Sequence, residues 1–112
     1  MRFEARELKP YAEPVSVNEL KLGKEYFSVT FVDDEGCIPI IDTLIFTGKT
    51  DEGLLRFQDV VSYRRGVRPD EDTAEGHATF YECTEDQMNV IFDYERALDV
   101  LMCCSLKRRD RA

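Results

Sequence analysis

The segment Lys24–Thr47 constrains the fold most, because it contains two strand-like runs joined by a short turn. In "KEYFSVTFV" (Lys24–Val32) bulky apolar side chains alternate along the run, which is typical of a half-buried strand. "DDEG" (Asp33–Gly36) ends in glycine, as tight turns often do. A run rich in β-branched residues, Ile38–Thr47, follows, and its Pro39 suits the start of an edge strand. The segment therefore predicts an antiparallel hairpin.

Two further strands are predicted beyond this hairpin. One begins at Leu54 and extends at least to Gln58, and the other spans His77–Cys83. Between them, Arg64–Gly76 is the longest polar stretch, basic at its start and acidic afterwards. Such a stretch is typical of a solvated surface loop.

The C-terminal part of the chain predicts a helix. Thr84 and Gln87 match a capping box, and apolar residues from Met88 to Met102 recur at helical spacing. We therefore predict a helix at about 85–104, which must cover an apolar face of the sheet.

Together these elements predict one α+β domain. The expected architecture is a curled antiparallel β-meander of four to five strands followed by one long helix packed on the sheet. Its layout, but no motif, resembles a small SH3-like half-barrel. The predicted organisation is an irregular segment 1–23, a β-meander 24–83, a C-terminal helix 84–105 and a basic tail 106–112.

Composition narrows the function classes. The chain has 112 residues and a net charge of −8, so binding to nucleic acid is disfavoured. No apolar run approaches the roughly 18 residues of a membrane span, and no secretory signal is recognised. Four cysteines without C-x-x-C spacing predict reduced thiols in a cytoplasmic protein. With His77 as the single histidine, we predict no metal site and no cofactor.

The residues Gly48, Lys49 and Thr50 spell the end of a phosphate-binding loop, but the context is wrong. The loop needs a glycine five residues before Gly48 and a helix after it. Thr43 stands at the first position, and a strand is predicted after the loop. We therefore interpret Gly48–Gly53 as a hairpin loop without nucleotide binding.

If that loop closes symmetrically, the hairpin places Asp42 opposite Asp59 on an apolar face. Three outcomes follow from this register. A bulge or a turn capped by Asp59 turns the carboxylates outward. Alternatively, an arginine neutralises them, or they form a functional pair that shares a proton or a divalent ion.

Apolar residues on both predicted faces of the sheet favour a non-catalytic protein-interaction module that self-associates. The alternatives are a small enzyme or metal binder built on Asp42 and Asp59, and an RNA-contacting barrel that uses the basic loop and tail. The candidate interaction residues are Tyr26, Tyr63, Tyr81, Arg64, Arg65 and Arg68.

Overall fold

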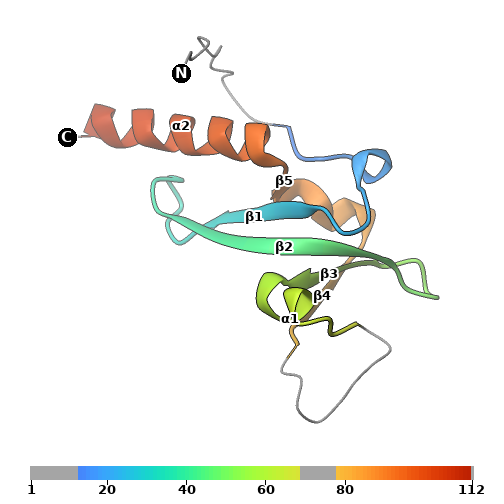
Figure 1. The fold of residues 1–112 in the computed structure, drawn as a ribbon. Coiled ribbons are helices and arrows are strands. Elements are labelled where there is room, and N and C mark those ends of the chain that lie inside the picture. The colour runs from blue at the N-terminus through green and yellow to red at the C-terminus, as the bar shows by residue number, and fades with distance from the viewer. Residues whose placement is uncertain (1–12, 69–77, 112) are drawn as a thin grey trace, which may run out of the picture.

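A computed structural model describes residues 13–68 and 78–111 of the chain. Its elements, with 3₁₀ helices written η, are η1 (Val17–Glu19), β1 (Glu25–Phe31), β2 (Pro39–Lys49), β3 (Leu55–Asp59), α1 (Val60–Arg64), β4 (Phe80–Cys83), η2 (Glu85–Val90), β5 (Ile91–Phe92) and α2 (Tyr94–Arg111). The strands form one antiparallel sheet in the order β4-β3-β2-β1-β5 (Figure 1).

The predicted fold class is confirmed. An antiparallel meander is followed by a long C-terminal helix that packs on the sheet through Val29, Phe92 and Ala97. The sheet stays open rather than closing into a barrel, and the likeness to SH3-like domains remains a prediction about layout.

The turn between β1 and β2 is held by Asp33. Its carboxylate accepts backbone N–H bonds from Cys37 at 3.0 Å and Ile38 at 2.8 Å. Gly36 adopts a φ of 72°, which a side chain would strain. The local sequence therefore closes the predicted hairpin by side-chain capping as well as by glycine.

The predicted register between β2 and β3 is wrong. β2 continues through Gly48 to Lys49, and the pairing shifts between Phe46 and Gly48, where a bulge inserts one residue. Phe46 consequently pairs with Phe57 instead of Leu55. A symmetric loop was the wrong assumption, because the strand did not stop at the glycine.

The C-terminal helix begins later than predicted. The capping box does form, since the Thr84 N–H donates to Gln87 Oε1 at 3.0 Å, but it caps the 3₁₀ helix η2. β5 then pairs with β1, and Asp93 starts α2 by accepting the Arg96 N–H at 2.9 Å. α2 also continues to Arg111, through most of the predicted tail.

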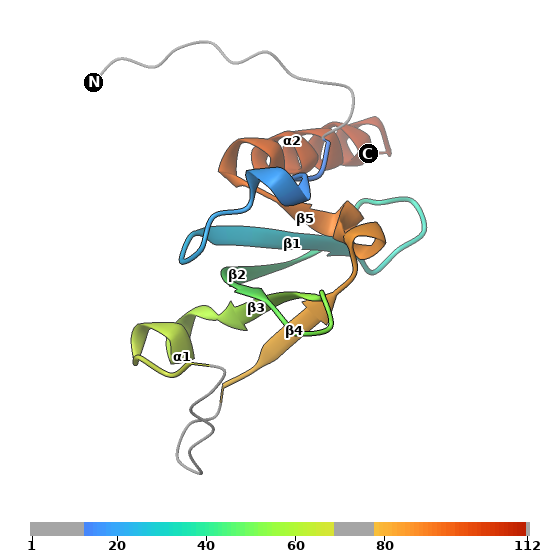
Figure 2. The ribbon, with the colours of Figure 1, turned by 90° about the vertical axis from the view of Figure 1, so that its right-hand side faces the viewer.

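Apolar side chains are buried on both faces of the sheet. The η2 face carries Tyr26, Leu44, Phe46 and Phe57, together with Ile91 of β5. These side chains pack with Val15 and Met88 from the segments beside the sheet. The opposite α2 face carries Phe27 and Val29, which pack with Phe92, Ala97 and Val100. In Figure 2 the backbone of α2 lies above β5 and β1. The chain itself therefore supplies a cover for part of each face.

Candidate functional site

α2 carries an apolar stripe that faces the sheet. Tyr94, Ala97, Leu98 and Leu101 follow the i, i+3, i+4, i+7 spacing that places side chains on one side of a helix. They line a cavity of about 170 Å³ together with Phe27 and Val29 of β1 and Ile41 of β2. We call this cavity the α2 groove.

The α2 groove is held by aromatic packing at one end and is open at its rim. The rings of Phe27 and Tyr94 meet edge to face, with centroids 4.6 Å apart. Ile41, Tyr94 and Leu98 each leave between 44% and 57% of their surface exposed. Three large side chains around one groove are thus left about half exposed by the described part of the chain.

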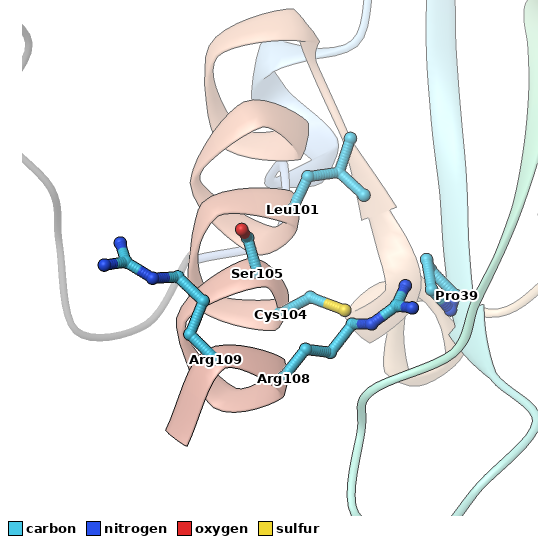
Figure 3. Close-up of a pocket in the computed structure, with 6 residues that line it drawn as sticks. All are labelled: Pro39, Leu101, Cys104, Ser105, Arg108 and Arg109. Carbon is cyan, nitrogen blue, oxygen red and sulfur yellow. The ribbon is translucent and has the colours of Figure 1, made fainter. Parts of the chain in front are cut away.

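A second cleft continues from the groove along α2. Its volume is about 410 Å³, and it is lined by Pro39, Leu101, Cys104, Ser105, Arg108 and Arg109. Leu101 lines both cavities, so the two adjoin. In Figure 3 Arg108 extends toward Pro39, whereas Arg109 projects to the other side of the helix. We call this region the arginine cleft.

The arginine cleft is a cationic site on an acidic protein. Within residues 13–68 and 78–111, no ion pair joins Arg108 or Arg109 to a carboxylate. Both side chains are exposed, and the chain as a whole carries a net charge of −8. The cleft therefore offers guanidinium donors that suit a carboxylate or another anion.

The two aspartates of the predicted carboxylate pair do not face each other. Asp42 pairs with Ser28 of β1, and Asp59 pairs with Leu44. Asp59 caps α1, because its carboxylate accepts the Ser62 N–H at 2.9 Å and the Thr79 N–H at 2.9 Å. Of the three outcomes considered, the geometry corresponds to the bulge and the turn capped by Asp59.

The pKa of Asp59 reflects this capping role. Burial raises it, but the hydrogen bonds from the Ser62 side chain, the Ser62 N–H and the Thr79 N–H outweigh that effect. The net result is a pKa below the usual value of 3.8. These hydrogen bonds stabilise the charged carboxylate of Asp59, which serves as a helix cap.

The three candidate tyrosines occupy different environments. Tyr26 is buried in the core, where its hydroxyl accepts the Lys21 N–H at 2.8 Å. Tyr63 lies on α1 beneath the guanidinium of Arg68, 4.0 Å from the ring centroid. Tyr81 is exposed on β4. Tyr26 is therefore a core residue, and its place among the candidate interaction residues was wrong.

The candidate arginines lie around the end of α1. Arg64 and Arg65 are exposed, and Arg68 donates to the carbonyls of Tyr63 and Val67. Figure 1 places α1 beside β3 and α2 beyond the β1 side of the sheet. The basic loop and the basic end of α2 therefore do not form one patch in the described structure.

The Gly-Lys-Thr segment has a structural role. Gly48 and Lys49 are strand residues. Thr50 closes the loop, because its N–H donates to the Leu54 carbonyl and its carbonyl accepts the Gly53 N–H. A strand, β3, follows it. The segment is therefore part of a hairpin, as predicted, but the loop lies between Lys49 and Leu55 instead of spanning Gly48–Gly53.

The four cysteines all lie in the described ranges and form no disulfide. Cys37 and Cys104 are buried, and the Cys104 thiol donates to the Cys37 carbonyl at 3.0 Å. Burial raises the pKa of Cys83. His77 lies outside the described residues.

Asp33, Glu35 and Cys37 gather potential ligand atoms within 4.8 Å of one another, a cluster that the sequence reading missed. Asp33 already accepts the hydrogen bonds that close the β1–β2 turn. The position of the Asp33 carboxylate is therefore explained by turn capping.

The sequence reading also missed the α2 groove. Its signal was present in the spacing from Tyr94 to Leu101, but we assigned these residues to a single helical stripe with Met88 and Phe92.

No helix among the described residues has the length and apolarity to cross a bilayer. No protein-family model, curated protein or solved structure matches this chain.

Proposed function

We propose that this chain is a non-catalytic interaction module that binds an apolar, acidic segment of a partner protein along α2. The observation that carries the proposal is the junction at Leu101 of an apolar groove and an arginine-lined cleft. Large apolar side chains of a partner would fill the α2 groove, and its carboxylates would pair with Arg108 and Arg109. A partner of this composition also explains why the arginines lie beside apolar surface.

A cytoplasmic location accords with this proposal, because the four cysteines form no disulfide and reduced thiols persist in that compartment. The enzyme or metal-binding alternative gains no support, since Asp59 serves as a helix cap. The RNA-contacting alternative gains none either, since the basic segments are separate.

The test is a selection of random 12-residue peptides displayed on phage against the full chain. We expect a consensus that combines two bulky apolar residues with Asp or Glu. A synthetic consensus peptide should bind the Leu98→Glu variant roughly 30-fold more weakly than it binds the wild-type chain. The reason is that burying an unpaired charge in the α2 groove costs on the order of 2 kcal/mol of binding free energy.

The matched control is Val61→Glu, which alters a similarly exposed apolar residue on α1, outside the groove. It should leave peptide affinity unchanged. Charge reversal by Arg108→Glu with Arg109→Glu should weaken binding and reduce its salt dependence. A selection without a consensus, or a consensus peptide indifferent to these groove and cleft variants, would contradict the proposal.

A further inference from the structure

The side of α2 that points away from the sheet carries an exposed apolar row with a charge at each end. At about 100° per residue, five side chains fall within about 40° of the direction of Met102 around the helix axis. All five are exposed, and they are Glu95, Leu98, Met102, Leu106 and Arg109. We call this surface the outer face of α2.

The outer face lies opposite the sheet. Ala97 and Cys104, which are buried, lie about 140–160° around the helix from Met102. Figure 1 shows the same arrangement, because all five strands lie on one side of α2. In Figure 3 Arg109 projects away from Pro39. A second helix that packs on the outer face would therefore not meet the sheet.

The residues of the outer face are arranged symmetrically about Met102. Leu98 and Leu106 lie four residues on either side of it, and Glu95 and Arg109 lie seven residues on either side. Seven residues are close to two helical turns, so the charged residues stay on the same face as Met102. The order along the helix is an acid, three apolar residues and a base. A reversed copy of the outer face is therefore complementary to it in charge and in apolar surface.

We propose that the outer face packs against the outer face of a second copy, with the two α2 helices antiparallel and Met102 on the twofold axis. One surface supplies both sides of such an isologous contact. Leu98 of each copy would pack against Leu106 of the other, and Glu95 of each copy would lie opposite Arg109 of the other. The contact removes three large apolar side chains of each copy from water and brings opposite charges together at both ends.

Charge selects the orientation and the register of this contact. A parallel pair of helices would set Glu95 against Glu95 and Arg109 against Arg109, and like charges in a contact are unfavourable. Met102 is also close to the middle of α2, so antiparallel helices centred on it overlap along almost their full length. Moving the axis by one turn in either direction would separate Glu95 from Arg109 and shorten the overlap. Charge and overlap thus agree on Met102.

This contact does not rest on the proposed peptide binding. Met102 and Leu106 line neither the α2 groove nor the arginine cleft. Arg108 extends toward Pro39, away from the outer face, and stays available to the carboxylates of a partner segment (Figure 3). Variants at Met102 and Leu106 therefore test the contact between copies without changing the peptide site.

The first measurement is sedimentation velocity of the full chain over a concentration series, where we expect a monomer–dimer equilibrium. Met102→Glu sets two carboxylates against each other on the axis and should weaken dimerisation tenfold or more, by an estimate of roughly one ordinary charge repulsion. Its circular dichroism spectrum should stay native, because Met102 is exposed. Val61→Glu is the matched control, since it alters an exposed apolar residue on α1 and should dimerise like the wild type.

Cysteine cross-linking tests the register. In a background with Cys83→Ser and Cys103→Ser, which removes the two cysteines that are not buried, Met102→Cys should form a covalent dimer on mild oxidation. Two packed helices bring the Cα atoms at their crossing point to about 5 Å, within disulfide range. Leu106→Cys is the control, because the proposed register separates its two copies by roughly 12 Å along the helices. A parallel pair would cross-link both variants equally.

A charge exchange tests the ends of the contact. Glu95→Arg should weaken dimerisation about tenfold, and adding Arg109→Glu should restore it. A chain that sediments as a monomer at its highest attainable concentration would overturn the proposal. So would a Met102→Glu variant that dimerises like the wild type, cross-linking of Leu106→Cys as fast as Met102→Cys, or a double charge variant that stays as weak as Glu95→Arg.

Discussion

The two halves of β2 are alike in composition and opposite in environment. In one half, Leu44, Ile45 and Phe46 are buried between β1 and β3. In the other, Ile40 and Ile41 are exposed, with β1 as the sole described neighbouring strand. Because both halves are rich in β-branched and apolar residues, side-chain type does not decide burial here. The number of neighbouring strands and the cover above them decide it.

The largest difference between the two halves is expected when one side chain in each half is truncated and the free energy of unfolding is measured. Leu44 and Ile40 lie four residues apart in the same strand, so their side chains point to the same face of the sheet. Leu44→Ala should lower the free energy of unfolding by about 2–5 kcal/mol, because it leaves a cavity in the core. Ile40→Ala should change the free energy of unfolding of the monomer by less than about 0.5 kcal/mol.

Urea unfolding at a protein concentration where the chain is monomeric measures both variants. Equal losses of stability in the two halves would contradict the distinction between them.

Removing the two aspartates should change the unfolding free energy by different amounts, although the difference is smaller than that between Leu44→Ala and Ile40→Ala. The larger loss is again expected at the residue that the fold uses. Asp59→Ala removes the cap of α1 and should cost about 1–2 kcal/mol. Asp42→Ala, at an exposed strand position, should have little effect on the unfolding free energy.

The pH dependence sharpens this second prediction. Because the pKa of Asp59 is lowered in the folded state, its stabilisation is present above its ordinary pKa and is lost as the pH falls through the folded value. Asp59→Asn should therefore lose less stability on acidification than the wild type. Thermal melts from neutral to acidic pH measure this, and parallel curves for the two proteins would contradict it.

The smallest effect is expected where the N-terminal segment meets α2. Glu19 accepts from Arg96 at 3.0 Å, and this bond, with those from Ser16, lowers the pKa of Glu19 to about 2. Glu19→Gln should reduce the melting temperature by less than Asp59→Ala does. The difference from the wild type should disappear as the pH falls from 4.5 toward 2, where the wild-type carboxylate also protonates.

Asp34→Asn is the charge-matched control, since it removes one carboxylate from an exposed turn. A change in melting temperature as large as that of Glu19→Gln would indicate a net-charge effect instead of a specific ion pair.

Local patterns predicted the strands well. The alternation in Lys24–Val32 and the turn at Asp33–Gly36 were sufficient to place β1 and the first hairpin, because their determinants are neighbours in sequence. The β2–β3 register was not predictable in the same way. The bulge after Phe46 depends on the packing of Phe46 against Phe57, which no pattern within one strand specifies.

The start of α2 was missed for a related reason. Met88, Ile91 and Phe92 fit a helical stripe, yet β5 forms because Phe92 pairs with Phe27 across the sheet. The cap at Asp93 is visible in the sequence but competes with the stronger capping box at Thr84. Tertiary pairing decided between two plausible starts, so the α2 groove that depends on the later start could not be placed.

The shortest strand has a consequence for how the molecule melts. Ile91 and Phe92 are adjacent in β5, so their side chains point to opposite faces, and each belongs to a different core cluster. Loss of β5 would therefore uncover both clusters at once, and neither can loosen while the other keeps β5 in place. Two small cores joined in this way should unfold in a single cooperative transition rather than in two steps.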